Sequence, residues 1–230
     1  METHVVIVEL QGGLGNQMFL YAVARALSVH HGVPLKLDVT SYRDDKLRKY
    51  KLHQFRVIEE FATPEETAKI RPSRGQFLKW TVGQIRNRMF PYRFRNVVWE
   101  RSKRFDGRVF QTGSDVFVAG WWQSEKYFSA IQDLIRSEFS FKYPPLGANA
   151  EMLDRIKKTT SVSLHVRRGD YVEDNAISAR FGTPSLAYYA RAVARICGAI
   201  ANPHLYVFSD DPAWAKQNLS FDVPTCFVSH

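Results

Sequence analysis

Apolar residues recur along the chain in two patterns, one typical of buried strands and the other of amphipathic helices. Continuous apolar, β-branched runs predict strands at residues 4–10, 116–122 and 205–208. Residues 17–30 and 183–200 instead place apolar side chains three and four positions apart, which predicts helices with one buried face. Strands that alternate with helices indicate an α/β fold with parallel sheets.

A glycine-rich turn follows the first strand, at residues 11–16, and a helix and a second strand complete a βαβ unit. Gly13, Gly15 and Asp38, which lies 23 residues after Gly15, fit part of a dinucleotide-binding fingerprint. One alternative is therefore an NAD-dependent oxidoreductase, although Met18 stands where the third glycine is expected. A plain strand-to-helix turn, in which glycines supply positive φ angles, explains the same residues.

A short segment rich in proline and glycine, YPPLG at residues 143–147, predicts a domain boundary. We therefore expect a first domain over residues 1–145 and a second over residues 146–230. The second domain should open with a helix over residues 148–158 and continue into the strand of the next motif.

The stretch SVSLHVRRGDY, residues 161–171, begins as a buried strand and ends in charged residues. Ligands of open α/β sheets bind at the carboxyl ends of strands. Arginine presents a planar set of donors that matches phosphate oxygens in pairs. This end of the strand therefore predicts an anion site, with the candidate residues His165, Arg167, Arg168 and Asp170 and with Gly169 allowing a sharp turn. An exposed ion pair between Arg168 and Asp170 is the structural alternative.

A second strand also runs into acidic residues, at Asp210 and Asp211. Asp211 precedes Pro212, which is typical of a helix N-cap. Asp210 is left as a candidate acceptor for a guanine N–H edge or for ribose hydroxyls. In a parallel sheet it should lie beside His165. The two aspartates are adjacent and not separated by one residue, and the seven histidines form no compact cluster in the sequence, so we expect no metal.

The net charge of +9 is concentrated in one region, where eleven Lys and Arg residues lie between Arg71 and Arg108 against two acidic residues. Such a region suggests a nucleic acid, a phosphorylated substrate or an acidic membrane surface as partner. A non-enzymatic nucleic-acid-binding or membrane-binding module is therefore a second alternative. Structurally, we interpret residues 76–89 as an amphipathic helix with a solvated basic face.

Cysteine content and apolar run length indicate the compartment. The chain has two cysteines, Cys197 and Cys226, too few for a disulfide scaffold, which favours a reducing compartment. No apolar run approaches the roughly 20 residues of a membrane span, and no signal-peptide pattern opens the sequence. These features predict a cytoplasmic protein, with peripheral contact to the inner face of the membrane as a hypothesis from the basic region.

Four blocks, in order along the chain, resemble the α-1,2-fucosyltransferases of glycosyltransferase family 11. They are LQGGLGNQMFLYA at residues 10–22, GWWQSEKYF at 120–128, HVRRGDY at 165–171 and FSDDPAW at 208–214. The resemblance implies two Rossmann-like domains of the GT-B type, with the acceptor side in the first and the GDP-fucose site in the second. Family members continue beyond the position of His230, so the resemblance also implies that the second domain is incomplete and its activity weakened.

The resemblance implies an inverting transfer of L-fucose from GDP-β-L-fucose to the 2-hydroxyl of a galactose-ended glycan, with no metal and no nucleic acid. Arg167 would contact the diphosphate, Arg168 would assist, and Asp170 would hold the loop. His165 and Asp210 would contact the nucleotide. Asn16 would reach toward the reaction centre, and backbone N–H groups near Gly13 and Gly15 would face the diphosphate. The block at residues 120–128 has no assigned catalytic role, and neither the catalytic base nor the oligomeric state can be inferred.

Overall fold

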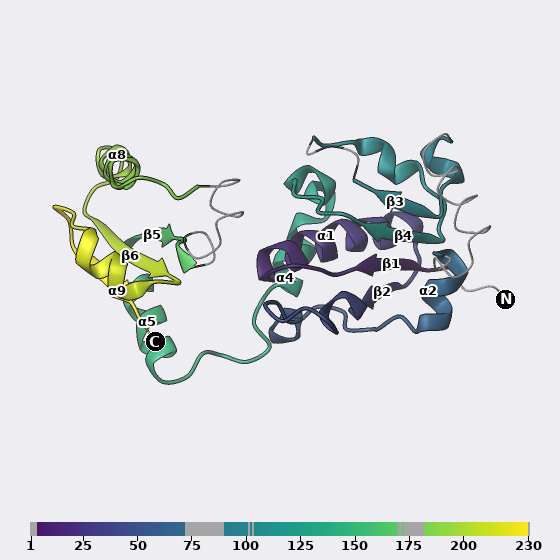
Figure 1. Ribbon diagram of the computed structural model, residues 1–230, viewed down its shortest axis with the longest axis horizontal. Coiled ribbons are helices and arrows are strands. Elements are labelled where there is room, and N and C mark those ends of the chain that lie inside the picture. Colours follow the sequence, from purple (N-terminus) through teal and green to yellow (C-terminus); the bar gives the residue numbers. More distant parts are fainter. Residues whose placement is uncertain are drawn as a thin grey trace. The chain divides into compact units, whose positions relative to one another are not determined.

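The computed structural model describes residues 4–71, 90–100, 102, 104–169, 172 and 182–229 (Figure 1). The chain forms two compact units, Met1–Tyr143 and Pro144–His230, and each is described by itself. The division falls beside the YPPLG segment in which the sequence places the boundary. Both units contain parallel strands and helices, so the expected α/β class is confirmed. The helix predicted over residues 76–89 lies outside the described residues.

The first unit is built on a parallel four-stranded sheet with the order β2-β1-β4-β3. Its strands are β1 (Val6–Glu9), β2 (Leu35–Asp38), β3 (Val97–Trp99) and β4 (Val116–Ala119). Because all four run in the same direction, the loops that follow them gather at one edge of the sheet. That edge is where a ligand site is expected in an α/β unit.

Helices cover both faces of this sheet. Helix α1 (Leu14–His31) supplies most of the larger core, and Figure 1 shows it beside β1 and β4. On the other face, Ile70 at the end of α2 (Pro64–Ile70) packs with Ile7 and Phe117. The sequence Thr63–Pro64 predicts a helix start with Thr63 as N-cap and Pro64 at the first position. The structure confirms this start of α2, where Thr63 and Glu66 form a reciprocal capping box.

Two predictions after β4 are wrong. The strand ends at Ala119 and not at Trp122, because Gly120 and Trp122 both have positive φ angles. Ser124 as N-cap and Glu125 in the first turn predict a single helix up to about Phe139. The structure divides this segment into η5 (Glu125–Tyr127), η6 (Ser129–Ile131) and α4 (Gln132–Glu138). Burial of Tyr127 against the Trp122 ring, with centroids 5.1 Å apart, overrides the local helix preference. Further 3₁₀ turns in the unit are η1 (Thr40–Tyr42), η2 (Leu52–Gln54), η3 (Tyr92–Phe94) and η4 (Gly107–Gln111).

A buried polar network joins α1 to α4. The Tyr21 hydroxyl donates to Glu138 Oε2 at 2.6 Å, and Arg25 Nε donates to Glu138 Oε1 at 2.9 Å. The same hydroxyl accepts a hydrogen bond from the Ile58 backbone N–H at 3.0 Å. Burial and the hydrogen bond to Glu138 raise the pKa of Tyr21 far above its ordinary value, so the hydroxyl stays protonated.

The second unit contains a parallel three-stranded sheet with the order β5-β6-β7. Its core is small: Val166, Tyr189, Val207, Ala215 and Leu219 form one cluster, and Val193, Leu205 and Tyr206 are also buried. Figure 1 shows α8 and α5 on opposite sides of β5 and β6. The elements are α5 (Ala148–Lys157), β5 (Thr160–Val166), α8 (Leu186–Cys197), β6 (Pro203–Ser209), α9 (Pro212–Asn218) and β7 (Thr225–Val228).

Strand β5 is not the buried strand that its sequence predicts. It lies at one edge of the sheet, and its alternate residues Ser161, Ser163 and His165 are exposed. Helix α5 has no buried residue and leaves this face open, whereas Val166 points into the core formed with α8 and α9. A half-exposed edge strand explains the serines in the motif, which a strand buried on both faces would not carry.

Helix α8 also differs from the expectation. It begins at Leu186, with Ser185 as the capping residue, and not at the Thr183–Pro184 pair. Of its residues only Tyr189 and Val193 are buried. None of the described helices is both long and apolar enough for a membrane span.

Candidate functional site

The predicted anion site lies at the carboxyl ends of two adjacent strands in the second unit. Arg167 and Arg168 directly follow β5, and Asp210 directly follows β6, which pairs with β5 in the register Val166 to Ser209. Arg167 Nε lies 3.2 Å from Asp210 Oδ2, and the Arg168 backbone N–H donates to Asp210 Oδ1 at 2.7 Å. The sheet therefore brings together the residues that are 42 positions apart in the sequence. Residues 167–169 are called the arginine turn below.

Asp210 is engaged with the arginine turn. Its burial favours the neutral acid, but hydrogen bonds from the Arg168 and Gly169 backbone N–H groups and the charge of Arg167 together hold the pKa of Asp210 below its ordinary value. Gly169 allows this approach, since a Cβ there would lie 3.0 Å from Asp210 Oδ2. The carboxylate thus holds the arginine turn and orients the Arg167 side chain. The sequence analysis gave the holding of this loop to Asp170, which lies outside the described residues.

Arg168 is anchored inside its unit. Its guanidinium lies 3.7 Å from the centre of the Trp214 ring on α9, and its Nε lies 3.4 Å from Asp211 Oδ2. Asp211 also caps α9 by accepting from the Trp214 backbone N–H at 3.1 Å, which confirms the predicted N-cap. These contacts support the backbone that carries Arg167, whose own side chain is 33% exposed. Arg167 is therefore the arginine better placed to meet a ligand.

His165 lies on the open face of β5, opposite Phe208 in the strand register. Its neighbour Val166 points to the other face and is fully buried. His165 is thus near the arginine turn along the chain but on the side of the sheet away from the core of α8 and α9. Its nucleotide contact stays a prediction.

The first unit carries a second cluster, made by the loops after β1 and β4. Gln123 Nε2 donates to Asn16 Oδ1 at 2.7 Å, and Gln11 Nε2 donates to the Gly120 carbonyl at 2.8 Å. The structure therefore links Asn16 to the block at residues 120–128, to which the sequence gave no role. The exposed Trp121 lies beside Gly12, where Trp121 Cζ3 is 3.1 Å from the position of an added Cβ. Asn16 and Gln123 come together because β1 and β4 are neighbours in the sheet, which the sequence does not show.

A glycine of the strand-to-helix turn does supply a positive φ angle, but it is Gly12 and neither Gly13 nor Gly15. Gly13 has φ −73° and caps α1, and Gly15 lies in the first turn of the helix, which begins at Leu14 and not at Gln17. Gly12 is the residue with a positive φ, +73°. A Cβ on Gly12 would also lie 2.6 Å from Asn16 Nδ2, so glycine is needed for two reasons.

The comparison with known families decides the identity of the chain. The model of the family described as Glycosyl transferase family 11 matches residues 5–229. The chain belongs to glycosyl transferase family 11. This family 11 chain is 32% identical over 218 residues to an α-1,2-colitosyltransferase of Escherichia coli, covering 93% of this chain and 71% of the relative. It is 31% identical over 107 residues to a galactoside 2-α-L-fucosyltransferase of Caenorhabditis elegans, covering 44% of this chain and 27% of the relative.

The family 11 chain also resembles a solved structure, that of NodZ α-1,6-fucosyltransferase soaked with GDP-fucose. The TM-score is 0.51 at 14% identity, and the match covers 100% of this chain and 78% of the other. This likeness concerns the fold and confirms the predicted α/β fold of the GT-B type. Membership of the family establishes that the chain is a glycosyltransferase.

Asp38, the candidate ribose-binding acid of an NAD-dependent oxidoreductase, is already engaged within the protein. Asp38 of this family 11 chain is 4% exposed, and its Oδ1 accepts hydrogen bonds from both the backbone N–H and the hydroxyl of Thr40, at 2.9 and 2.6 Å. This carboxylate holds the turn after β2. A ribose-binding acid would have to present its oxygens to a ligand.

We expect Gly12→Ala to destabilise the family 11 chain and Gly15→Ala to leave it as stable or more stable. Alanine at a positive φ costs about 1 kcal/mol or more, and here the methyl group would also displace the Asn16 amide. In the helix, alanine gains roughly 0.5–1 kcal/mol over glycine, and no atom lies within 4 Å of the Gly15 Cβ position. Thermal melting of both variants measures the difference. Equal melting temperatures would contradict the assignment of the positive φ angle to Gly12 and of Gly15 to the helix.

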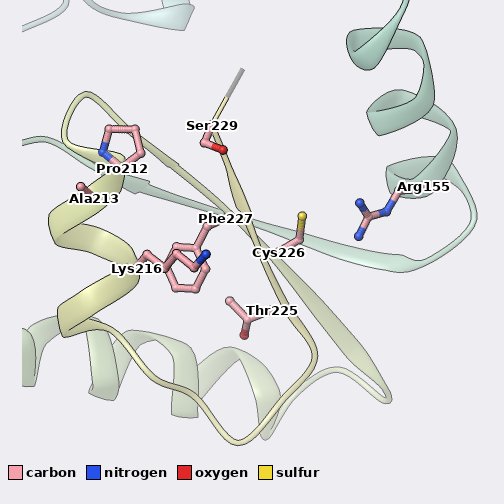
Figure 2. A pocket seen from close by; sticks show the side chains of 8 residues that line it. All are labelled: Arg155, Pro212, Ala213, Lys216, Thr225, Cys226, Phe227 and Ser229. Carbon is pink, nitrogen blue, oxygen red and sulfur yellow. The ribbon is translucent and has the colours of Figure 1, made fainter.

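A cavity of about 670 Å³ runs along β7, the other edge strand of the second unit. Figure 2 shows Arg155 of α5 on one side of β7 and Lys216 of α9 on the other. The volume is in the range of small-molecule sites, but none of the predicted site residues lines the cavity. Among the described residues, no three or more His, Cys, Asp and Glu residues are grouped so that they could hold a metal ion.

Proposed function

We propose that this glycosyltransferase moves L-fucose from GDP-β-L-fucose to the 2-hydroxyl of a galactose-ended glycan. The observation that carries the proposal is the arginine turn, where Asp210 holds Arg167 at the carboxyl edge of a parallel sheet. The similarity to an α-1,2-colitosyltransferase supports the linkage, and the similarity to a galactoside 2-α-L-fucosyltransferase supports the donor sugar and the acceptor. NodZ, which was soaked with GDP-fucose, supports the fold in which such a donor is bound.

In the proposed reaction, the oxygen of the acceptor 2-hydroxyl forms a bond to C1 of fucose while the bond from C1 to the β-phosphate oxygen breaks. The hydroxyl proton leaves to a base, and the bonding electron pair goes to the departing GDP. Negative charge therefore grows on the diphosphate in the transition state. Arg167 stabilises this charge, because a guanidinium already held in position requires little reorganisation during the reaction. Inversion at C1 follows from a single displacement.

We also propose that transfer needs no metal, since a fixed guanidinium can stabilise the leaving diphosphate in place of a divalent cation. The chemistry of the described donor set agrees with this, because Asp210 and Asp211 are both engaged with arginines. Activity that a chelator abolishes and Mn²⁺ restores would contradict the proposal.

The first experiment is thermal unfolding of the chain with GDP, GDP-fucose, NADH or no ligand. A ligand at a hundred times its dissociation constant adds about 2.7 kcal/mol to stability, which is readily measured as a rise in melting temperature. We expect stabilisation by GDP and GDP-fucose and none by NADH, followed by fucosyl transfer to a galactoside. Stabilisation by NADH alone would overturn the proposal.

A second donor is favoured by the most extensive match among the relatives described above, the α-1,2-colitosyltransferase. Colitose is L-fucose without its 3-hydroxyl, so both sugars present the same leaving diphosphate to Arg167. Competition between GDP-fucose and GDP-colitose for one galactoside acceptor distinguishes the two. If kcat/KM for GDP-colitose exceeded kcat/KM for GDP-fucose, colitose would be the transferred sugar. The reaction class would be unchanged.

We propose a cytoplasmic enzyme with peripheral contact to an anionic membrane surface. The support is the pair of free thiols, Cys197 and Cys226, and the basic region between Arg71 and Arg108. Co-sedimentation with vesicles should increase with the fraction of anionic lipid and fall with salt. Equal binding to neutral and anionic vesicles would remove the membrane hypothesis.

A further inference from the structure

The turn after β4, residues 120–123, is held in an unusual backbone conformation. Gly120 has φ +118°, and a Cβ on it would lie 3.0 Å from Glu100 Cβ and 3.1 Å from the Glu100 backbone nitrogen. Trp122 has φ +51°, which is uncommon for a residue other than glycine and rarest for a large side chain. Such strain persists only where the surroundings enforce it, and it is concentrated at functional sites.

The surroundings of Trp122 do enforce this conformation. Its side chain is 1% exposed, its Nε1 donates to the Ala119 carbonyl at 2.8 Å, and its ring packs edge-on against Tyr127. Because Trp122 points into the core, its two neighbours in the chain, Trp121 and Gln123, are exposed. The strained turn therefore presents an indole and a carboxamide at the carboxyl edge of the first sheet.

The exposed groups belong to one surface. Trp121 is 45% exposed and lies against the Gly12 backbone, and Gln123 donates to Asn16 Oδ1 at 2.7 Å. The hydrogen bond from Gln11 to the Gly120 carbonyl fixes the two loops to each other. Each of these side chains is neutral. A neutral indole beside two neutral amides suits an uncharged, hydroxyl-rich ligand, whereas the arginine turn suits a diphosphate.

We propose that Trp121, Asn16 and Gln123 form the binding platform for the pyranose ring of the acceptor glycan. A hexopyranose has a face of C–H groups and a rim of hydroxyls. The C–H face would pack on the Trp121 indole, and the rim hydroxyls would exchange hydrogen bonds with the carboxamides of Asn16 and Gln123. The proposal rests on the proposed function, since it assigns the site of that reaction's second substrate.

The test compares Trp121→Ala, Trp121→Phe and Phe94→Ala in the full chain. Phe94 is 50% exposed and precedes β3, so it lies at the opposite, amino edge of the same sheet and is a matched control. We expect Trp121→Ala to raise the KM for lactose about tenfold or more, and Trp121→Phe to raise it less, because a smaller ring keeps part of the stacking. Phe94→Ala should leave this KM unchanged.

Two further measurements separate acceptor binding from donor chemistry. The melting shift with GDP should be the same in Trp121→Ala and in the wild type, because the platform does not include the arginine turn. Saturation-transfer NMR of lactose with the chain alone measures acceptor binding without turnover, and its signal should fall in Trp121→Ala. An unchanged KM and an unchanged NMR signal would overturn the platform. If the wild type neither bound GDP nor transferred fucose, the proposed function would be wrong. The NMR signal of lactose would still test the platform in that case.

Discussion

Replacing Arg167 with alanine should lower kcat for fucosyl transfer by roughly a hundredfold, about 3 kcal/mol of barrier. In the proposed reaction this guanidinium faces the charge that grows on the leaving GDP, and the variant removes it. Arg167→Lys should recover only part of the rate, because an ammonium keeps the charge but not the planar fork that matches two phosphate oxygens. Initial rates at saturating GDP-fucose and acceptor measure the effect.

The control for this prediction is Arg195→Ala. Arg195 is exposed in the last turn of α8, so the variant makes the same change of charge in the same unit without touching the arginine turn. Its kcat should equal that of the wild type. If Arg167→Ala turned over at the wild-type rate, the diphosphate assignment would be wrong. Equal rate losses in both variants would point to net charge and not to a specific contact.

Replacing Glu138 with alanine should produce the largest loss of stability, about 3 kcal/mol, in the first unit. The variant leaves the Arg25 guanidinium and the Tyr21 hydroxyl without the carboxylate that now accepts from both. Breaking a buried ion pair by removing one partner typically costs about 3–5 kcal/mol, and we take the lower end because Arg25 is 18% exposed. For a unit of this size the melting temperature should fall by roughly 10 °C.

Asp133→Ala is the matched control on the same helix. Asp133 also pairs with an arginine, Arg136 at 3.2 Å, but the two side chains are 87% and 72% exposed. Such an exposed pair contributes about 0–0.5 kcal/mol, so this variant should melt close to the wild type. Glu138→Gln should be intermediate, because it can still accept from Tyr21 but no longer balances the charge of Arg25. Equal melting temperatures of the Glu138→Ala and Asp133→Ala variants would show that the buried network contributes no more to stability than an exposed ion pair.

Local signals in the sequence were sufficient for several elements. The Thr63–Pro64 start of α2 and the Asp211–Pro212 start of α9 carry their capping chemistry in adjacent residues, and both are confirmed. The broken helix after Ser124 could not be inferred in this way. Its interruption depends on Tyr127 packing against Trp122 and Phe105, contacts that exist only when the chain has folded.

The candidate site likewise depends on contacts that the sequence does not show. Residue type and position at a strand end were enough to single out Arg167, Arg168 and Asp210. The sequence could not show that Asp210 accepts from the backbone beside the arginines, because that contact needs the register of β5 and β6. Nor could it assign Gln123, since the pairing with Asn16 follows from β4 lying next to β1 in the sheet.

The two units differ in how much apolar core supports them. The buried cluster of the second unit is small, and α5 adds no buried residue to it, whereas the main cluster of the first unit is much larger. We therefore expect the second unit to unfold at the lower temperature. It also carries the arginine turn, the proposed donor site, so the free energy of donor binding there would add directly to its stability by mass action. In a cell, the amount of intact enzyme would then follow the supply of nucleotide sugar, since chains without donor would be degraded faster.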